Sequence, residues 1–246
     1  MRKLQFCVLV LLVLVPLGCE NGTSVNDRPF HITLVFDEQV PSWWRSAFVS
    51  AAERWEQIVR HELPEAMLNV PAGDFPLFHG LEETPAIVGP ERGTRVYVRT
   101  FSSASTYPVA IGAPVLQRSL PSPTTTLGII SVNSFVQEKD MDPRFLRSTA
   151  VHELGHTLGL CAFVQGVEPS WVDGKRGITK GKFTLEGYQK EFNAVVDNLD
   201  FNNGNHWSFV GDVMSVAGSQ SRITYVSIGA LMDLGYPAVW EGAGRI

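Results

Sequence analysis

The hydrophobic pattern at the start of the folded part of the chain predicts one strand followed by one long helix. Residues 31–36 are rich in β-branched and aromatic side chains and begin with period-two alternation, which is typical of a strand. From Ser42 to Arg60 the apolar side chains recur with helical spacing, and Ser42 stands where an N-cap is expected. We therefore expect an amphipathic helix that ends before Pro64.

Two further strands are predicted in the middle of the chain. Residues 95–101 alternate in the manner of a strand, and residues 127–132 form a second strand-like run. Between them, residues 108–123 are rich in Pro, Ser and Gly. This composition is typical of a long irregular loop, which we expect there.

A second long helix is predicted over residues 143–158. Asp142 can cap its start and Pro143 suits the first helical turn. Gly159 stands where the helix is expected to end.

The chain beyond Gly159 is predicted to be mostly irregular and helical. A glycine-rich stretch reaches Gly181, and a short helix is expected over residues 185–196. A polar turn at 202–205 and a last helix over 226–234 complete the pattern.

Composition and charge indicate a globular protein that does not bind nucleic acid. The 246 residues are 44% hydrophobic and 18% charged, so the chain can bury a core. The formal net charge is −5, and no run of Lys or Arg provides the basic stripe that a phosphate backbone requires. We expect a monomer with one domain over residues 30–246.

The N-terminus predicts export. Arg2 and Lys3 precede an apolar run over residues 4–17 that is too short to span a bilayer comfortably, which indicates a signal peptide over residues 1–18.

The end of this segment predicts a lipid anchor. Leu17-Gly18-Cys19 resembles the bacterial lipobox, in which the cysteine is acylated, although Pro16 departs from the usual pattern. We therefore expect lipidation of Cys19, a polar tether over residues 19–29, and a location at the membrane surface of a bacterial cell envelope. Ordinary signal cleavage followed by secretion is the alternative.

Cys161 is then the single cysteine of the predicted domain, and we expect it to be a small buried hydrophobic residue.

Candidate chemistry lies on the helix predicted over residues 143–158. His152, Glu153 and His156 form a His-Glu-x-x-His string, which places both imidazoles on one helix face where they can share a zinc ion. Zinc would lower the pKa of a water molecule and polarise a carbonyl, while Glu153 would act as general base. These residue types predict peptide hydrolysis.

A glycine also lies inside this predicted helix. Gly155 costs the helix about 1 kcal/mol relative to alanine, so we expect close packing at this position.

Gly159 follows the second histidine by three residues, an arrangement found in metzincin zinc proteases. Their compact form has a third histidine three residues after this glycine, but Ala162 occupies that position here. The downstream motifs resemble the leishmanolysin family of metzincins, in which an insertion precedes the third histidine. The segments that carry this resemblance are Phe183-Thr184 with Tyr188, Asn205-His206-Trp207-Ser208, Gly211-Asp212-Val213-Met214-Ser215, Ile223-Thr224 and residues 230–236.

This resemblance implies a zinc endopeptidase that cleaves proteins or peptides, with His206 as the third zinc ligand. It also implies that Met214 belongs to a Met-turn that forms an apolar floor under the metal. The implied fold is α+β and two-lobed, with a twisted mixed sheet and a long helix in the N-terminal lobe. The active-site helix would lie at the cleft, and the C-terminal lobe would be mostly helical and irregular.

Several alternatives remain open at this level. The third ligand could instead be Glu186 or Glu191, and Cys161 is a further alternative to His206. A catalytically silent zinc-binding surface lipoprotein is the rival function, although a purely structural zinc site would not need Glu153. The remaining histidines lack partners at ligand spacing and are assigned no role; they are His31, His61 and His79.

Overall fold

The computed structural model describes residues 28–71, 86–103, 105, 107–161, 169–173, 177–202, 206–215 and 222–246. The predicted signal peptide, Cys19, His79, Ala162 and most of the predicted turn at 202–205 lie outside the described residues. No helix among the described residues is long and apolar enough to cross a membrane.

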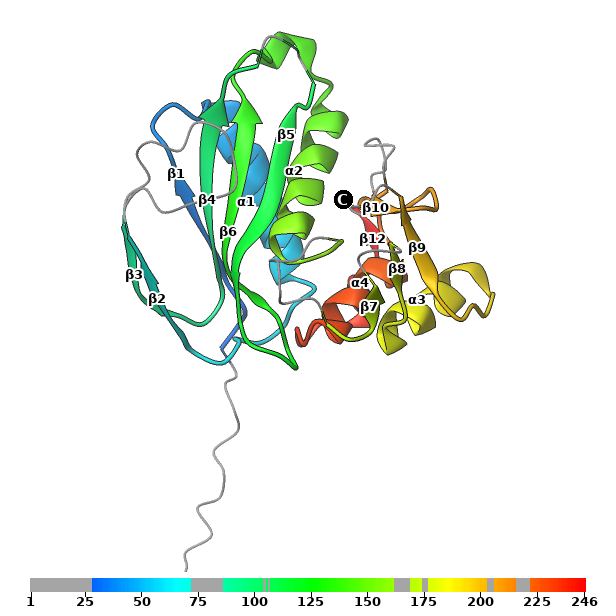
Figure 1. Ribbon diagram of the computed structural model, residues 1–246. Coiled ribbons are helices and arrows are strands. Elements are labelled where there is room, and N and C mark those ends of the chain that lie inside the picture. Colours follow the sequence, from blue (N-terminus) through cyan, green and yellow to red (C-terminus); the bar gives the residue numbers. More distant parts are fainter. Residues whose placement is uncertain are drawn as a thin grey trace, which may run out of the picture.

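A four-stranded mixed sheet organises the N-terminal half (Figure 1). Its order is β1 (Ile32–Phe36), β4 (Thr94–Phe101), β6 (Thr125–Asn133) and β5 (Ala110–Gln117). The first three strands are parallel, and β5 runs antiparallel to β6 at one edge. The strands predicted at 31–36, 95–101 and 127–132 are confirmed, and β6 is buried along its whole length.

The prediction of a loop over residues 108–123 was wrong for half of this range, because Ala110–Gln117 forms β5. Its Pro and Gly content suggested irregular backbone, but β5 is an edge strand that, among the described strands, pairs with β6 alone. An edge strand tolerates proline because one side of its backbone needs no partner, and Pro114 lies in this strand. A two-stranded sheet of β2 (Ala66–Val70) and β3 (Ile87–Glu91) was not predicted; it buries apolar side chains with Leu127 of β6.

Two helices cover one face of the main sheet. Helix α1 (Ser42–Glu56) and helix α2 (Pro143–Thr157) pack against each other, and the indole Nε1–H of Trp55 donates to the carbonyl of Val151 at 3.0 Å. Side chains of β4 and β6 such as Val96 and Ile130 join the helices in one core.

The ends of α1 differ from the prediction. The N-cap is Pro41, Ser42 is the first helical residue, and no side-chain hydrogen bond caps this end. The helix ends at Glu56 rather than Arg60, because the backbone of Val59 instead bridges to Ala238.

The start and end of α2 agree with the sequence. The carboxylate of Asp142 accepts hydrogen bonds from the backbone N–H groups of Arg144 and Phe145, and Pro143 is the first helical residue. Leu158 is the C-cap, and Gly159 follows with φ of 96°, a left-handed conformation that glycine adopts without a Cβ penalty. Figure 1 shows α2 along the edge of the sheet, facing the C-terminal segments.

The C-terminal half contains helices α3 (Lys182–Phe192) and α4 (Tyr225–Asp233), which pack together. The helix predicted at 185–196 starts three residues earlier and stops at Phe192, where Asn193 has a left-handed φ of 52°. The last helix, predicted at 226–234, is confirmed within one residue at each end.

The same half contains short strands that the prediction of a mostly irregular and helical region missed. A small antiparallel sheet has the order β10 (His206–Trp207), β9 (Leu199–Asn202), β8 (Ile178–Thr179) and β7 (Val172–Asp173). Strand β11 (Arg222–Ile223) pairs with β12 (Gly244–Arg245). Two 3₁₀ turns, Glu138–Asp140 and Trp240–Gly242, complete the described elements, and the fold is α+β with a mixed sheet.

Candidate metal centre

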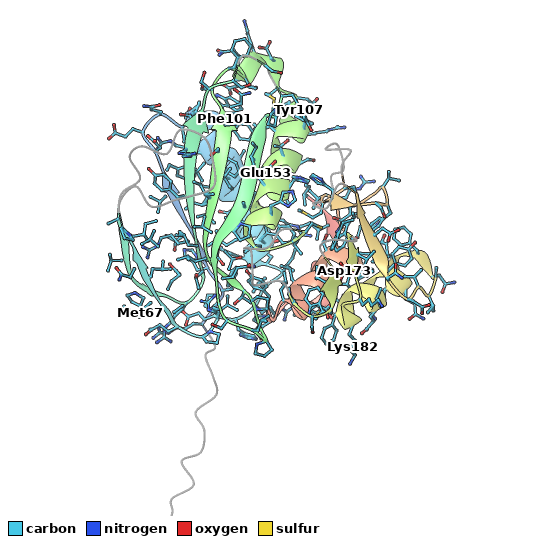
Figure 2. The ribbon with its side chains drawn as sticks, viewed as in Figure 1. Met67, Phe101, Tyr107, Glu153, Asp173 and Lys182 are labelled. Carbon is cyan, nitrogen blue, oxygen red and sulfur yellow. The ribbon has the colours of Figure 1, made fainter. Side chains whose placement is uncertain are left out.

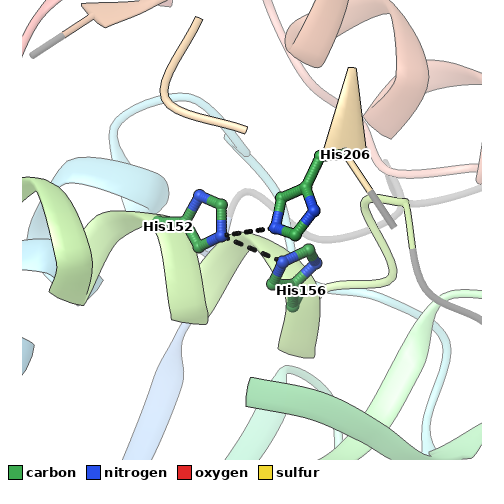
Figure 3. A group of neighbouring side chains, drawn as sticks. All are labelled: His152, His156 and His206. Atoms are coloured by element: carbon green, nitrogen blue, oxygen red, sulfur yellow. Dashed lines mark hydrogen bonds between the residues drawn. The ribbon is translucent and has the colours of Figure 1, made fainter. Parts of the chain in front are cut away.

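Three histidines from two distant parts of the chain meet at one point (Figure 3). His152 and His156 lie four residues apart on α2, and their Nε2 atoms are 3.1 Å apart. His206 at the start of β10 places its Nε2 atom 3.2 Å from Nε2 of His152. The possible ligand atoms of all three residues lie within 4.8 Å of one another, so one ion could contact all three.

Backbone carbonyls determine which ring nitrogens face this point. Nδ1 of His152 lies 2.6 Å from the carbonyl oxygen of Val213, and Nδ1 of His156 lies 3.0 Å from that of Leu160. Because a carbonyl can only accept, each Nδ1 carries the proton, and in the neutral ring each Nε2 presents a lone pair. Two lone pairs facing each other at 3.1 Å cannot hydrogen-bond, so this arrangement favours a cation between them.

Two of the three separations between the nitrogens are compatible with a shared metal ion, as a comparison with zinc coordination shows. Tetrahedral coordination with Zn–N bonds of about 2.0–2.1 Å separates two ligand nitrogens by about 3.3 Å. The two Nε2 separations of 3.1 and 3.2 Å are close to this value. Three nitrogen ligands leave a fourth position for water or substrate, as in catalytic zinc sites.

Burial and the neighbouring rings favour the neutral form of His156 and His206. Burial, together with the adjacent His152 and His206 rings, lowers the pKa of His156 well below its ordinary value of 6.5. Burial, and in second place the neighbouring His152 ring, lowers the pKa of His206 to about 4. Both rings are therefore unprotonated at neutral pH, which is the state that binds a metal ion.

Glu153 lies between α2 and the edge strand β5 (Figure 2). Burial raises the pKa of its carboxyl, while the neighbouring His152 and the backbone N–H of Gly112, which donates to the carboxylate, oppose this increase. Gly112 also permits the close approach of the two elements, since a Cβ atom there would lie 2.3 Å from the carbonyl oxygen of Glu153. A carboxylate with a raised pKa is a better base near neutral pH than an exposed one.

Met214 packs against α2 at Gly155. The side chain is fully buried, and a Cβ atom at Gly155 would lie 2.4 Å from its sulfur. This contact explains the glycine inside the helix, as expected from the sequence. Met214 therefore lies next to the helix that carries His152 and His156, and its place in a Met-turn under a metal stays a prediction.

The turn after α2 brings the chain back to His156. The N–H of Gly159 donates to the carbonyl of His156 at 2.9 Å, and the next carbonyl, that of Leu160, accepts from Nδ1 of the same histidine. Cys161 is buried, and burial raises the pKa of its thiol well above the ordinary value. Cys161 therefore stays protonated and packs in the core, as expected.

The rival ligands have other partners. Glu186 pairs with Lys190 at 3.5 Å, and Glu191 pairs with Arg222 at 2.6 Å. Within the described part of the chain, the group of side chains close enough to share an ion consists of the three histidines alone.

The other described histidines lie outside this group. His31 contacts Glu56 at 2.9 Å on the surface, and His61 is exposed. Neither belongs to the group that could share an ion.

Two contributors to the site were not predicted from the sequence. The carbonyl of Val213 orients His152, and the backbone N–H of Gly112 donates to Glu153. Both act through backbone groups, so the residue types at these positions do not indicate the role.

Comparison of the sequence with protein-family models and with curated proteins finds no match.

Proposed function

We propose that the chain is a zinc-dependent endopeptidase that resembles the leishmanolysin group of metzincins. His152, His156 and His206 would hold the ion, and Glu153 would be the general base. The observation that carries this proposal is the convergence of Nε2 lone pairs beside a buried carboxylate with a raised pKa. A structural zinc site would instead be closed by four protein ligands and would need no base.

Zinc bound here would lower the pKa of water toward neutrality and polarise the carbonyl of a peptide bond. Glu153 would accept the proton of the attacking water on a carboxylate oxygen and then deliver it to the leaving amine. The N–H of Gly112 would hold this carboxylate in place during both transfers. The carbonyls of Val213 and Leu160 would keep the histidine rings in the tautomer that binds metal.

Three features favour the metzincin type within this class. The helix ends at Gly159, the next histidine ligand comes from far downstream, and Met214 packs beside the ligand-bearing helix. The mixed sheet with its antiparallel edge strand β5 next to α2 agrees with the N-terminal lobe of such a protease. We propose that the C-terminal half is the second lobe.

The experiment that tests this function compares three forms of residues 20–246: the wild-type sequence, Glu153→Gln and Glu186→Gln. Zinc content and cleavage of casein are measured for each. We expect one zinc per chain in all three and loss of cleavage in Glu153→Gln alone. Absence of zinc from the wild type would contradict the proposal, and zinc without cleavage would favour the rival function, a silent zinc-binding lipoprotein.

The proposed location is the surface of a bacterial membrane, through acylation at Cys19. The mass of the exported protein tests this proposal separately, because an unmodified N-terminus would exclude the anchor without affecting the enzyme.

A further inference from the structure

A buried carboxylate that the proposed chemistry does not use lies close to the histidine cluster. Asp212 is fully buried, and each of its two oxygens accepts two hydrogen bonds. Oδ1 accepts from the backbone N–H of Met214 at 2.7 Å and from the hydroxyl of Ser227 at 2.8 Å. Oδ2 accepts from the backbone N–H and the hydroxyl of Thr224 at 2.9 and 2.6 Å. These four neutral donors compensate the cost of burying the charge.

The first connection from Asp212 to the site runs through the turn that it closes. The bond from the Met214 N–H to Oδ1 spans a single intervening residue, Val213, and fixes the backbone there. The carbonyl of Val213 is the group that accepts from Nδ1 of His152 at 2.6 Å. The position of this carbonyl, and hence the direction of Nε2 of His152, depends on the turn.

The second connection runs through Ser227 to the strand that carries His206. The hydroxyl of Ser227 donates to Asp212 and accepts from the indole Nε1–H of Trp207 at 3.0 Å. The backbone N–H of Trp207 in turn donates to the carbonyl of Met214 at 3.1 Å. Trp207 directly follows His206, so both of its hydrogen bonds restrain the backbone that presents this histidine.

We propose that Asp212 is a positioning residue of the metal centre that orients His152 and His206 together. This proposal rests on the metal site of the proposed function, but not on peptidase activity. Its physical basis is the number of acceptor positions on one carboxylate. An amide of the same shape offers only one oxygen, so one pair of donors would lose its partner, and the turn or its link to Thr224 and α4 would loosen.

The test compares Asp212→Asn with a matched control, Asp233→Asn. Asp233 is also a hydrogen-bonded carboxylate of the C-terminal half: it accepts from the N–H groups of Phe183 and Thr184 and from the hydroxyl of Thr184 at the start of α3. None of these groups is hydrogen-bonded to a histidine of the cluster. The measurements are the zinc Kd, by competition with a chelator, and the visible absorption spectrum of the cobalt-substituted protein.

For Asp212→Asn we expect a zinc Kd raised by about 10- to 100-fold and a changed cobalt spectrum, because loss of an outer partner misplaces ligands. For Asp233→Asn we expect a lower melting temperature with the wild-type Kd and spectrum. A folded Asp212→Asn protein with the wild-type Kd and spectrum would overturn the proposal.

A second variant serves if Asp212→Asn does not fold. Ser227→Ala removes the link between Asp212 and Trp207 and should also raise the Kd, while an unchanged Kd and spectrum would overturn the proposal. Wild-type protein that binds zinc without cleaving casein would contradict the proposed peptidase and leave this comparison intact. Failure of the wild type to bind zinc would contradict both.

Discussion

Each of the two histidines on α2 uses its two ring nitrogens for different tasks. Nδ1 donates to a backbone carbonyl, that of Val213 or Leu160, and Nε2 faces the centre of the cluster. Such pairing fixes both the tautomer and the orientation of a ligand before metal arrives. Glu153 differs from these histidines, because its carboxylate accepts from the backbone N–H of Gly112 and is not in the group that could share an ion.

This separation of roles predicts opposite effects of two substitutions. Glu153→Gln should keep zinc and lower the rate of casein cleavage by about 10²- to 10⁴-fold, the usual contribution of a general base. His206→Ala should lose zinc and activity together, because only two of the three proposed nitrogen ligands would remain. His31→Ala, which removes a surface contact with Glu56, is the control and should change neither. Stoichiometric zinc in His206→Ala, measured by metal analysis, would contradict the ligand assignment.

The lowered pKa values of His156 and His206 predict how the stability of the metal-free protein depends on pH. Unfolding returns each ring to its ordinary pKa of 6.5, whereas the pKa of folded His206 is about 4. Between these values the unfolded chain binds more protons at these two rings, so their contribution to the free energy of unfolding falls as the pH falls from about 6.5 to about 4. Above pH 6.5 this contribution is fully present.

Urea unfolding in the presence of a chelator, at several pH values, measures this dependence. The His206→Gln variant should show a weaker decrease over the same range, because one of the two titrating groups is removed. The same pH dependence in the wild type and in His206→Gln would contradict the prediction.

At the scale of elements, the contact between α2 and the turn at Met214 depends on a glycine. Gly155→Ala would favour the helix by about 1 kcal/mol from intrinsic propensity. The added Cβ would, however, lie 2.4 Å from the sulfur of Met214. Because overpacking costs about 1–3 kcal/mol, we expect a net decrease in the free energy of unfolding, together with weaker zinc binding.

Urea unfolding of a double-mutant cycle measures this coupling. Met214→Ala removes the side chain that would collide with the new methyl group, so Gly155→Ala should be less destabilising in that background than in the wild type. If Gly155→Ala changed the free energy of unfolding equally in both backgrounds, the contact with Met214 would not be the reason for a glycine at this position.

Local patterns predicted the elements that depend on neighbours in sequence. The limits of α2 follow from Asp142, Pro143 and Gly159, whose effects act within one helical turn. Strand β5 was missed because its composition resembles a loop, and only its place at the sheet edge makes Pro114 acceptable. The short strands β7 to β10 are two to four residues long, which is too short for a periodic signal.

The candidate site could likewise be predicted only in part from local sequence patterns. The pair of His152 and His156 follows from helix geometry alone. His206 lies 50 residues after His156, and only the resemblance of its surrounding motifs indicated it. The hydrogen bonds of Asp212 connect segments that no local pattern places together.

At the scale of the whole molecule, the histidine cluster that could hold a metal ion joins the two halves of the chain. His152 and His156 belong to the helix that packs on the main sheet, whereas His206 belongs to the small C-terminal sheet. One core cluster contains Trp55 of α1 as well as Met214 and Leu231, so the two halves also share buried apolar contacts. An ion bound to all three histidines would add a further link between halves that already pack together.

Removal of the metal should therefore lower the stability of the whole domain. A ligand that binds only the folded state at 1,000 times its Kd contributes about 4 kcal/mol. For a domain of this size each kcal/mol changes the melting temperature by about 2–4 °C, so a chelator should lower it by about 8–16 °C. Differential scanning calorimetry with and without chelator measures the change. His152→Ala is the control, since the melting temperature of a protein that cannot hold zinc should not change when the chelator is added. If the melting temperature of the wild type were also unchanged, an ion shared by the two halves would be excluded.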